Sequence, residues 1–356
     1  MRSSRVVLLS GLAGLALAAL ACGATSGAST DESEVGTRPP RQWDPPKTKA
    51  GNLRVATFNI RNFPKDTMSD SDAGADGGAA PDRDTRPAPL VRKLSETDEA
   101  MLVDILAKLD FDVLAVQEIN DTRRFDDVLT RLGERTGRRY QSVYNLAWDH
   151  PQHLGIVARA DRVRIESPRV HADIATRPTM RAGLSARIVS TKAGGADFGL
   201  LVLHLASGDT GGRARLRAEQ ASFAAKAVAA RQVESGDADF VVVGDMNTAR
   251  PDELSGFDGA MAESDSGLDR ASRDLACSTY YTKGPTNPML EPSLIDHVFV
   301  ASLAERDESV PMAVGTHCHE RSCASFESDS AEHGTSYWSV SDHCPVYFEL
   351  ADVDRD

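Results

Sequence analysis

The chain has 356 residues, of which 41% are hydrophobic and 26% are charged, proportions that are typical of a soluble globular protein. This length suffices for one large domain or two of average size. The formal net charge of -13 excludes a strongly basic protein that binds nucleic acid through bulk charge alone. A nucleic-acid substrate is still compatible with this charge, because a local metal site can bind phosphate inside an acidic protein.

Residues 1–21 predict a secretory signal peptide. Arg2 and Arg5 form a short basic start, and an apolar run over 6–21 is too short to predict a membrane span. The run ends in Ala19-Leu20-Ala21-Cys22-Gly23, which resembles a bacterial lipobox, in which the cysteine is diacylated and becomes the mature N-terminus. Ala19 replaces the usual leucine, so an ordinary cleaved signal is the alternative. We expect export to the bacterial cell envelope with a lipid anchor on Cys22, on the periplasmic or the cell-surface face.

Two stretches lack the apolar pattern of a folded segment. Residues 22–52 are rich in Ser, Thr, Gly, Pro and charge, which predicts a flexible tether. Residues 69–89 are rich in Asp, Ala, Gly and Pro and lie between patterned segments, which predicts a disordered loop inserted into the domain. The aspartates of this loop suggest calcium as an alternative, but their spacing does not match the calcium-loop template and favours a solvated loop. One domain over 53–350 is therefore predicted.

The patterned segments alternate between helix and strand. Ser95, followed three residues later by Asp98, predicts the N-cap of the first helix. Apolar residues at helical spacing predict helices over 95–109, 125–132 and 213–233. Short apolar runs predict strands over 53–58, 111–116, 154–158, 184–189, 198–203, 240–243, 294–300 and 345–350. This order predicts a mixed α/β domain with more sheet than a simple βαβ repeat.

Polar side chains that can bind metal or phosphate lie at the ends of these strands. In chain order they are Asn59, Glu118, His204, Asp245, Asn247, Asp296, Asp342 and His343. A single Asn or Asp after a strand is usually a turn residue, but turns alone do not explain the repetition. Because a sheet holds its strand ends rigidly, groups from several strands can converge on one site. Oxygen ligands suit magnesium or calcium and histidines suit proton transfer, so the set predicts metal-assisted attack of water on a phosphate.

Six short motifs occur in order along the chain. They are Ala56-Thr57-Phe58-Asn59-Ile60, Gln117-Glu118, Leu203-His204-Leu205, Gly244-Asp245-Met246-Asn247, Ile295-Asp296-His297 and Ser341-Asp342-His343. In this order they resemble the endonuclease/exonuclease/phosphatase superfamily, which includes deoxyribonuclease I. The resemblance covers 53–350. It implies a metal-dependent phosphoesterase with a four-layer α/β sandwich, in which two packed mixed β-sheets are flanked by helices.

The resemblance also implies a role for each matching residue. Glu118 matches the principal metal carboxylate, and Asn59 and Asp342 match residues that hold the metal or its waters. His343 matches the group that takes the proton from the attacking water or contacts the phosphate, and Asp296 matches its orienting partner. The implied metal is Mg²⁺, with Mn²⁺ or Ca²⁺ as alternatives.

Further matches surround the expected phosphate. Asp245 and Asn247 match groups that position the nucleophile and the phosphate. His204 matches a second histidine, which contacts phosphate or protonates the leaving oxygen. Arg181 matches a phosphate-binding arginine less closely. The competing candidates for that role are Arg177 and Arg187.

The chain departs from the deoxyribonuclease-like pattern beside His204. In such members a glutamate supports the second histidine, whereas the corresponding region over 144–153 offers Asp149 and no glutamate. His153 and His297 also lie beside motifs. Both are interpreted as structural or peripheral, because strand alternation turns His297 away from Asp296.

Four cysteines follow Cys22, and export favours disulfide formation. Cys277, Cys318, Cys323 and Cys344 allow three pairings. The short spacing of Cys318 and Cys323 suggests that they close a small loop, which leaves Cys277 for Cys344. Free thiols are an alternative. So is a zinc site in the segment His317-Cys318-His319 with the following Cys323, although the spacing fits no standard tetrahedral pattern.

The long helix after His204 bears on the substrate. Arg213, Arg215 and Arg217 could contact a polyanion, or they could lie on a solvated face with a salt bridge from Glu219. The first hypothesis is an exported nuclease that cleaves DNA or RNA, acts as a monomer and contacts the membrane through its lipid alone. The alternatives are a phosphoesterase for phospholipids or small phosphate esters and, more remotely, a non-catalytic binding module.

Overall fold

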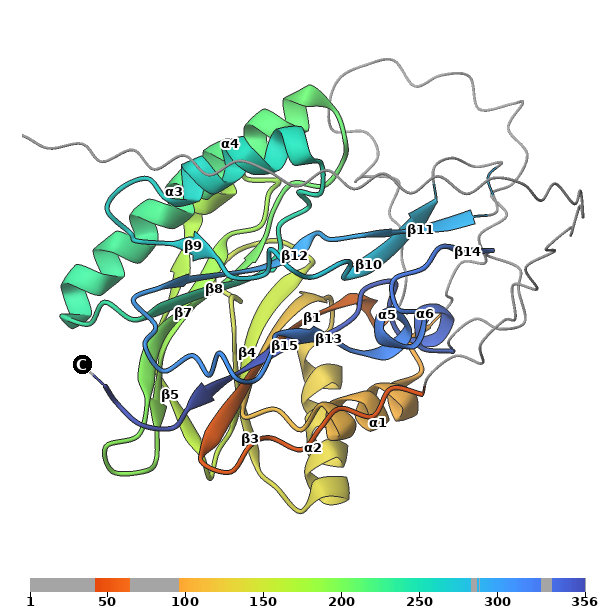
Figure 1. Cartoon of the computed structure of the whole chain (residues 1–356), viewed down its shortest axis with the longest axis vertical. Coiled ribbons are helices and arrows are strands. Elements are labelled where there is room, and N and C mark those ends of the chain that lie inside the picture. Colours follow the sequence, from red (N-terminus) through yellow and green to blue (C-terminus); the bar gives the residue numbers. More distant parts are fainter. Residues whose placement is uncertain (1–41, 65–95, 283–286, 288, 328–334, 356) are drawn as a thin grey trace, which may run out of the picture. The chain divides into compact units, whose positions relative to one another are not determined.

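The computed structural model describes residues 42–64, 96–282, 287, 289–327 and 335–355 (Figure 1). The predicted signal peptide, Cys22 and most of the predicted tether lie outside this part of the chain, as do the loop at 69–89 and Ser95. Within the described ranges, no helix combines the length and the hydropathy needed to cross a membrane.

Two six-stranded sheets form the centre of the domain. In spatial order the first contains β13 (Ala313–Val314), β15 (Val346–Ala351), β1 (Asn52–Phe63), β2 (Val113–Ile119), β4 (His153–Arg159) and β3 (Tyr140–Tyr144). The second contains β5 (Val163–His171), β6 (Gly183–Ser190), β7 (Asp197–His204), β8 (Phe240–Asp245), β12 (Asp296–Ala301) and β9 (Asp269–Arg270). Both sheets are mixed, because β1 is parallel to β2, and β7 to β8, while their other neighbours run antiparallel.

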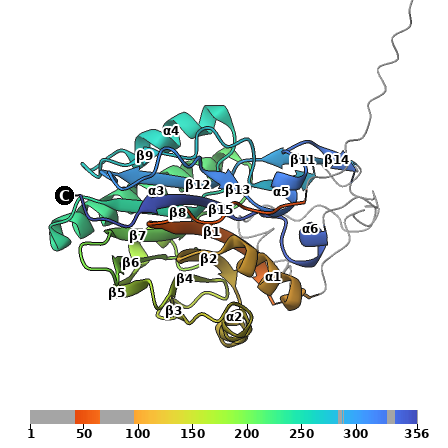
Figure 2. The ribbon, with the colours of Figure 1, turned by 60° about the horizontal axis from the view of Figure 1, so that its bottom comes forward.

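The alternation of side chains along the strands creates the layers. One set of alternate residues, such as Val55 on β1 and Val243 on β8, meets between the two sheets in a shared core. The opposite set on the first sheet packs against α1 (Glu99–Leu109) and α2 (Thr122–Thr136). On the second sheet it packs against α3 (Gly211–Ser235) and α4 (Pro251–Met261). The four-layer α/β sandwich is therefore confirmed (Figure 2).

The predicted strands and the three predicted helices are all present, with shifted ends. Asp98, and not Ser95, is the N-cap of α1, and its side chain accepts from Met101 N at 3.0 Å. The edge strands β3 and β5 were not predicted, because their polar and partly exposed residues do not show strict apolar alternation. Helix α4 was also missed, because only a few of its residues are buried.

The packed part of the chain begins before the predicted boundary at Leu53. Trp43 is 2% exposed and belongs to the core beneath α1 and α2. A Cβ atom at Gly315 would lie 2.8 Å from the Trp43 ring, so this glycine makes room for the indole. The N–H of Lys49 donates to Glu349 Oε2 at 3.0 Å. Residues just before β1 are therefore part of the folded domain.

A smaller unit adjoins the sandwich near its C-terminus. It contains the three-stranded sheet β10 (Thr279–Thr282), β11 (Met289–Ser293) and β14 (Phe326–Glu327), with the short helices α5 (Thr316–Glu320) and α6 (Thr335–Ser339). Its apolar cluster comprises Cys277, Tyr280, Leu290, Cys318, Phe326, Tyr337 and Cys344. We call this unit the C-terminal annex.

The annex holds two disulfides, Cys277–Cys323 and Cys318–Cys344. The expected pairing of Cys318 with Cys323 is therefore wrong. Sequence spacing favoured a local loop, but the fold places residue 344 beside residue 278, where Cys344 N donates to the carbonyl oxygen of Ser278 at 2.8 Å. Both bonds consequently run from this pair of adjoining segments to α5 and the turn that follows it.

Candidate active site

Strand ends from both sheets meet at one edge of the sandwich. Asn59 on β1 pairs with Gln117 next to Glu118 on β2, and His204 on β7 pairs with Asp245 on β8. Asn59 Nδ2 lies 3.1 Å from Glu118 Oε1 and 3.1 Å from Asp245 Oδ2. His204 Nε2 lies 3.5 Å from that Glu118 oxygen and 3.4 Å from the Asp245 oxygen. Four predicted site residues therefore form one contiguous cluster.

A second histidine completes this edge. His343 Nδ1 lies 2.8 Å from Asp296 Oδ2, while its Nε2 faces Asp245 Oδ2 at 3.8 Å. The loop before β15 is held by Ser341, whose hydroxyl donates to the carbonyl of Asn59 at 2.8 Å and accepts from His343 N at 3.1 Å. In this geometry the imidazole carries a proton on Nδ1 and donates it in a hydrogen bond to Asp296, while Nε2 faces the cluster.

Burial and charge shift the acidities of these groups in opposite directions. Burial raises the pKa of Glu118 and raises the pKa of Asp245 to about 7, although His343 partly offsets the latter. Burial opposes protonation of His343, but the carboxylates of Asp296, Asp245 and Asp342 outweigh it and hold its pKa well above the usual value. Excess negative charge is therefore concentrated around one imidazole.

His204 differs from His343 in both environment and charge. Burial, followed by the nearby Arg181, lowers the pKa of His204 well below its usual value, so the ring is neutral. Its Nδ1 is buried, and no described residue, Asp149 included, provides a hydrogen-bond partner for it. Its Nε2 faces two carboxylate oxygens, which favours the proton on Nε2. Among the described residues, none therefore takes the place of the glutamate that supports this histidine in deoxyribonuclease-like proteins.

The donor set fits a hard divalent cation. Glu118, His204 and Asp245 offer ligand atoms that all lie within 4.8 Å of one another. Asp342 Oδ1 is buried without a hydrogen-bond partner among the described residues, while Arg61 Nε lies 3.7 Å away. Clustered carboxylates with an unsatisfied buried oxygen are costly without a compensating positive charge. A cation that prefers oxygen ligands would remove this cost.

Asn59 contacts both carboxylates of the cluster through its side-chain amide. Its amide nitrogen faces the carboxylates of Glu118 and Asp245, and its Oδ1 accepts from Arg61 N at 3.0 Å. In this arrangement Asn59 holds the carboxylates in place. Asn247 similarly braces the site, because its backbone N–H donates to Asp245 Oδ1 at 2.9 Å and its Nδ2 donates to Leu205 O at 3.2 Å.

Unusual backbone conformations concentrate at the same edge. Glu118 has φ 64° and Asn247 has φ 53°, values that cost a non-glycine residue about 1–3 kcal/mol. Gly244, with φ 136°, precedes Asp245, and a Cβ atom there would lie 2.0 Å from the carbonyl oxygen of Leu203. The surrounding sheets must therefore stabilise a local conformation that aims these carboxylates inward.

The Arg181 side chain forms hydrogen bonds within the protein. It is 5% exposed and donates from Nε to His204 O at 3.0 Å, from Nη1 to Gln152 Oε1 at 2.8 Å and from Nη2 to Leu205 O at 2.6 Å. These bonds fix the backbone where β7 ends. Of the competing arginines, Arg187 pairs with Asp197 at 2.7 Å, and Arg177 lines a surface cavity beside η1 (Ala172–Ala175).

The basic surface predicted on α3 from Arg213, Arg215 and Arg217 is smaller in the structure. Arg217 is 1% exposed, and its Nε lies 2.6 Å from Glu253, which replaces the expected partner Glu219. Its Nη1 donates to the carbonyls of Ala206 and Gly208 at 2.8 and 2.7 Å. Arg217 therefore fixes the loop after β7, while Arg215 is exposed.

The structural interpretation of His297 is confirmed. Its Nε2 lies 2.7 Å from Thr248 O, its Nδ1 lies 3.2 Å from Ser272 Oγ, and burial lowers its pKa to about 4. Sequence reasoning missed several groups that touch the site residues, among them Arg61, Ser278 and Ser341. Ser341 stood inside a recognised motif, whereas Ser278 is brought to Asp296 by tertiary structure alone.

Comparison with known proteins places this edge in a family. The model of the Endonuclease/Exonuclease/phosphatase family matches residues 56–343. No curated protein sequence matches the chain.

Solved structures share the fold. A TDP2 from D. rerio, humanized by 14 mutations, is 17% identical with a TM-score of 0.52, over 85% of this chain and 99% of that one. The human Nocturnin catalytic domain with bound sulfate is 17% identical with a TM-score of 0.51, over 89% and 100%. The Bacteroides thetaiotaomicron mannosyl-6-phosphatase is 18% identical with a TM-score of 0.50, over 84% and 99%. On the strength of the family match, the chain belongs to the Endonuclease/Exonuclease/phosphatase family, whose members are enzymes that act on phosphate ester bonds.

Proposed function

We propose that this phosphoesterase is a metal-dependent phosphodiester hydrolase that is exported, anchored to the cell envelope and active on DNA or RNA. The observation that carries the hydrolase assignment is the convergence of the Asp296–His343 pair with the Glu118–Asp245 carboxylates, in which one imidazole nitrogen is oriented and the other faces the cluster. This is the arrangement that a general base beside a metal site requires.

The residues divide the work of in-line hydrolysis. His343 Nε2 takes the proton from the attacking water, and Asp296 fixes the tautomer and stabilises the imidazolium that forms. Asp245 and Asn247 orient the water and the phosphate. Glu118, Asp245 and Asp342 would hold Mg²⁺, or Mn²⁺ or Ca²⁺, which when bound neutralises charge on the phosphate oxygens.

His204 supports a diester substrate. Its lowered pKa favours a neutral ring that donates an Nε2–H hydrogen bond to a phosphate or leaving oxygen, in place of a full proton transfer. The TDP2 of D. rerio, a structure of similar fold with a TM-score of 0.52, was solved with a single-strand DNA product. We therefore place nucleic acid first among the substrates.

A phosphoesterase acting on small phosphate esters or on phospholipids is the second candidate. A mannosyl-6-phosphatase shares the fold, and a lipid anchor would hold the site close to lipid headgroups. These substrates differ from nucleic acid in size and charge, so a panel of substrates separates the candidates.

The test is turnover by the mature chain, expressed without its signal peptide and retaining Trp43. Plasmid DNA, RNA, sphingomyelin, a phosphoinositide, a sugar phosphate and a chromogenic diester are each supplied with Mg²⁺, Mn²⁺, Ca²⁺ or chelator. We expect metal-dependent cleavage of DNA or RNA. Turnover restricted to a lipid or a phosphate monoester would reject the nuclease, and no turnover of any ester would reject the hydrolase.

Export and anchoring are supported by two observations. The N-terminal sequence resembles a lipobox ending in Cys22, and two disulfides are typical of proteins from oxidising compartments. Mass spectrometry of the N-terminal peptide from the membrane fraction tests this proposal. A diacylglyceryl group on Cys22 is expected, and Cys22→Ser should abolish it, whereas an unmodified mature N-terminus at another position would indicate an ordinary signal.

A further inference from the structure

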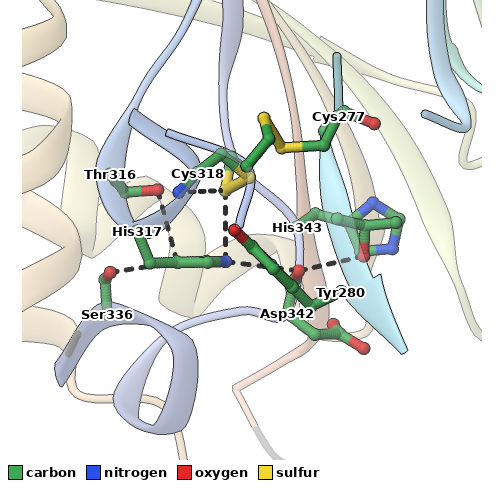
Figure 3. The surroundings of a disulfide bond; sticks show 12 residues. Cys277, Tyr280, Thr316, His317, Cys318, Ser336, Asp342 and His343 are labelled. Atoms are coloured by element: carbon green, nitrogen blue, oxygen red, sulfur yellow. Dashed lines mark hydrogen bonds between the residues drawn. A yellow bond between two sulfur atoms is a disulfide. The ribbon is translucent and has the colours of Figure 1, made fainter. Parts of the chain in front are cut away.

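Both disulfides of the annex lie one residue from the groups that form or support the Asp296–His343 pair. Cys277 precedes Ser278, and Cys344 follows His343. The Cys277–Cys323 and Cys318–Cys344 bonds tie these two positions to the same short segment, α5 and the following turn. Figure 3 shows His343 and Asp342 on the segment that leads into this disulfide region.

Ser278 connects the first disulfide to the pair directly. Its hydroxyl donates to Asp296 Oδ2 at 2.7 Å, and this same oxygen lies 2.8 Å from His343 Nδ1. The hydroxyl oxygen also accepts from Asp296 N at 3.0 Å. Two hydrogen bonds on one oxygen, from a hydroxyl and from an imidazole N–H, fix the rotation of the Asp296 carboxylate. Asp296 is 1% exposed, and its other oxygen has no partner among the described residues.

The backbone on either side of Ser278 is joined to the His343 loop. Thr279 forms an antiparallel bridge with His343, and its hydroxyl donates to Asp342 O at 2.9 Å. Cys344 N donates to Ser278 O at 2.8 Å. A displacement of residues 277–279 would therefore move both members of the pair at once.

Apart from these contacts, the annex has only a small buried core. Helix α5 has five residues, too few to be stable alone. Three of the seven buried residues of the annex cluster are half-cystines. The buried His317 reaches the disulfide, with Nε2 3.1 Å from Cys344 Sγ and 3.4 Å from Asp342 O (Figure 3). Reduction would thus remove the covalent part of a small core.

We infer that Ser278 is a positioning residue for the Asp296–His343 pair, and that the two disulfides act with it as a clamp, so that the hydrolase reaches full turnover only when both are oxidised. This inference rests on the proposed hydrolase function. The chain would then be poorly active in a reducing cytosol and would gain activity after export. On export, each pair of thiols gives two electrons and two protons to a disulfide oxidant, which forms one disulfide in the chain and leaves the oxidant as a dithiol. A reducing dithiol reverses each step, which restores two thiols in the chain and oxidises the dithiol.

The first test compares Ser278→Ala with Ser278→Thr in the oxidised mature chain, using a chromogenic diester with Mg²⁺. Ser278→Ala should lower kcat roughly 10- to 100-fold with little change in KM, because the base is misoriented while the substrate still binds. Ser278→Thr keeps the hydroxyl and should recover most of kcat. Equal kcat in wild type and Ser278→Ala would overturn the positioning role, and so would an equal loss in both variants.

The second test uses reduction. The mature chain is treated with dithiothreitol, its four thiols are alkylated and counted, and kcat is measured beside near-UV circular dichroism. A fall in kcat of at least about 10-fold is expected. Cys277→Ala/Cys323→Ala and Cys318→Ala/Cys344→Ala should each lose part of kcat without treatment. Full kcat in the reduced chain, or in either double variant, would overturn the clamp.

A spectroscopic readout separates this inference from the proposed function. The Nδ1 proton of His343, bonded to Asp296, should give a low-field NMR resonance in the oxidised chain whether or not any ester is cleaved. We expect the resonance to disappear in the reduced chain and in Ser278→Ala, and to persist in Ser278→Thr. An oxidised chain that shows the resonance but cleaves no ester would reject the function alone. Persistence of the resonance after reduction would reject the clamp alone. If reduction unfolds the domain, the comparison of Ser278→Ala with Ser278→Thr tests the inference.

Discussion

Two regions of the molecule hold the site. The ends of strands in the main core carry Asn59, Glu118, His204 and Asp245, whereas His343 lies in a loop that adjoins the annex. The strands behind the first group carry fully buried side chains such as Val55 and Leu200, packed between the sheets. The His343 loop depends on hydroxyl contacts from Ser341 and Thr279 and on two disulfides.

This difference separates what holds each half of the site. Burial of a large apolar side chain stabilises by about 1.5–3 kcal/mol, and the strands of the main core contribute many of these. The annex cluster is small, so each disulfide, typically worth about 2–4 kcal/mol, is a larger part of its stability. We therefore expect changes in the two regions to affect different properties: activity for the annex and global stability for the main core.

The largest effect is expected for His343→Ala. Loss of the general base should lower kcat by about 10²- to 10⁴-fold, while the variant still folds. The matched control is His319→Ala, which removes an exposed imidazole from the annex and should leave kcat unchanged. Steady-state hydrolysis and thermal unfolding measure both effects. Near-wild-type turnover in His343→Ala would contradict the assignment of the base.

Asp296→Asn sharpens the role of the pair. The carboxylate raises the pKa of His343 against the effect of burial, so its removal should lower that pKa. A base must be unprotonated to act, so turnover rises with pH through the pKa of His343, and the acidic limb should move to lower pH in the variant. At alkaline pH kcat should still be lower, about 10-fold or more, because orientation is lost. An unchanged limb at fixed Mg²⁺ would refute this electrostatic account.

Leu200→Ala addresses the other region. This side chain is fully buried between the sheets, so its truncation should lower the free energy of unfolding by about 2–5 kcal/mol. The kcat of the remaining folded protein should be close to that of wild type, because Leu200 lies in the core between the sheets and is not one of the site residues. Chemical denaturation beside active-site titration makes the measurement. A large loss of kcat without loss of stability would show that the two regions are not separable as described.

Arg215→Ala is expected to have the smallest effect. Arg215 is exposed on α3 and should change the free energy of unfolding by less than about 0.5 kcal/mol. If the substrate is nucleic acid and α3 contacts its backbone, the slope of log affinity against log salt should fall in magnitude by about one. Binding to single-stranded DNA over a salt series provides the slope. An unchanged slope would place the nucleic-acid path away from this helix.

The sequence was informative where apolar strands end in polar residues. The eight predicted residues of the cluster occur at one edge. Pairing between neighbouring strands brings the residues at strand ends together, whereas Asp342 and His343 lie in the loop before β15. Prediction failed where the outcome depends on contacts between distant segments. The disulfide pairing followed from the position of Cys344 beside Ser278, and the burial of Arg217 followed from backbone carbonyls that no sequence pattern reveals. Edge strands β3 and β5 were missed for their weak alternation.

Metal dependence tests the central proposal most directly. The rate of diester hydrolysis by the oxidised mature chain is measured over a series of Mg²⁺ concentrations, in wild type and in Glu118→Gln. We predict a saturable dependence in wild type, loss of hydrolysis in chelator, and a Glu118→Gln variant that needs at least about 10-fold more Mg²⁺ for half-maximal rate. Hydrolysis at the full rate in chelator, or an identical Mg²⁺ dependence in the two proteins, would contradict the account.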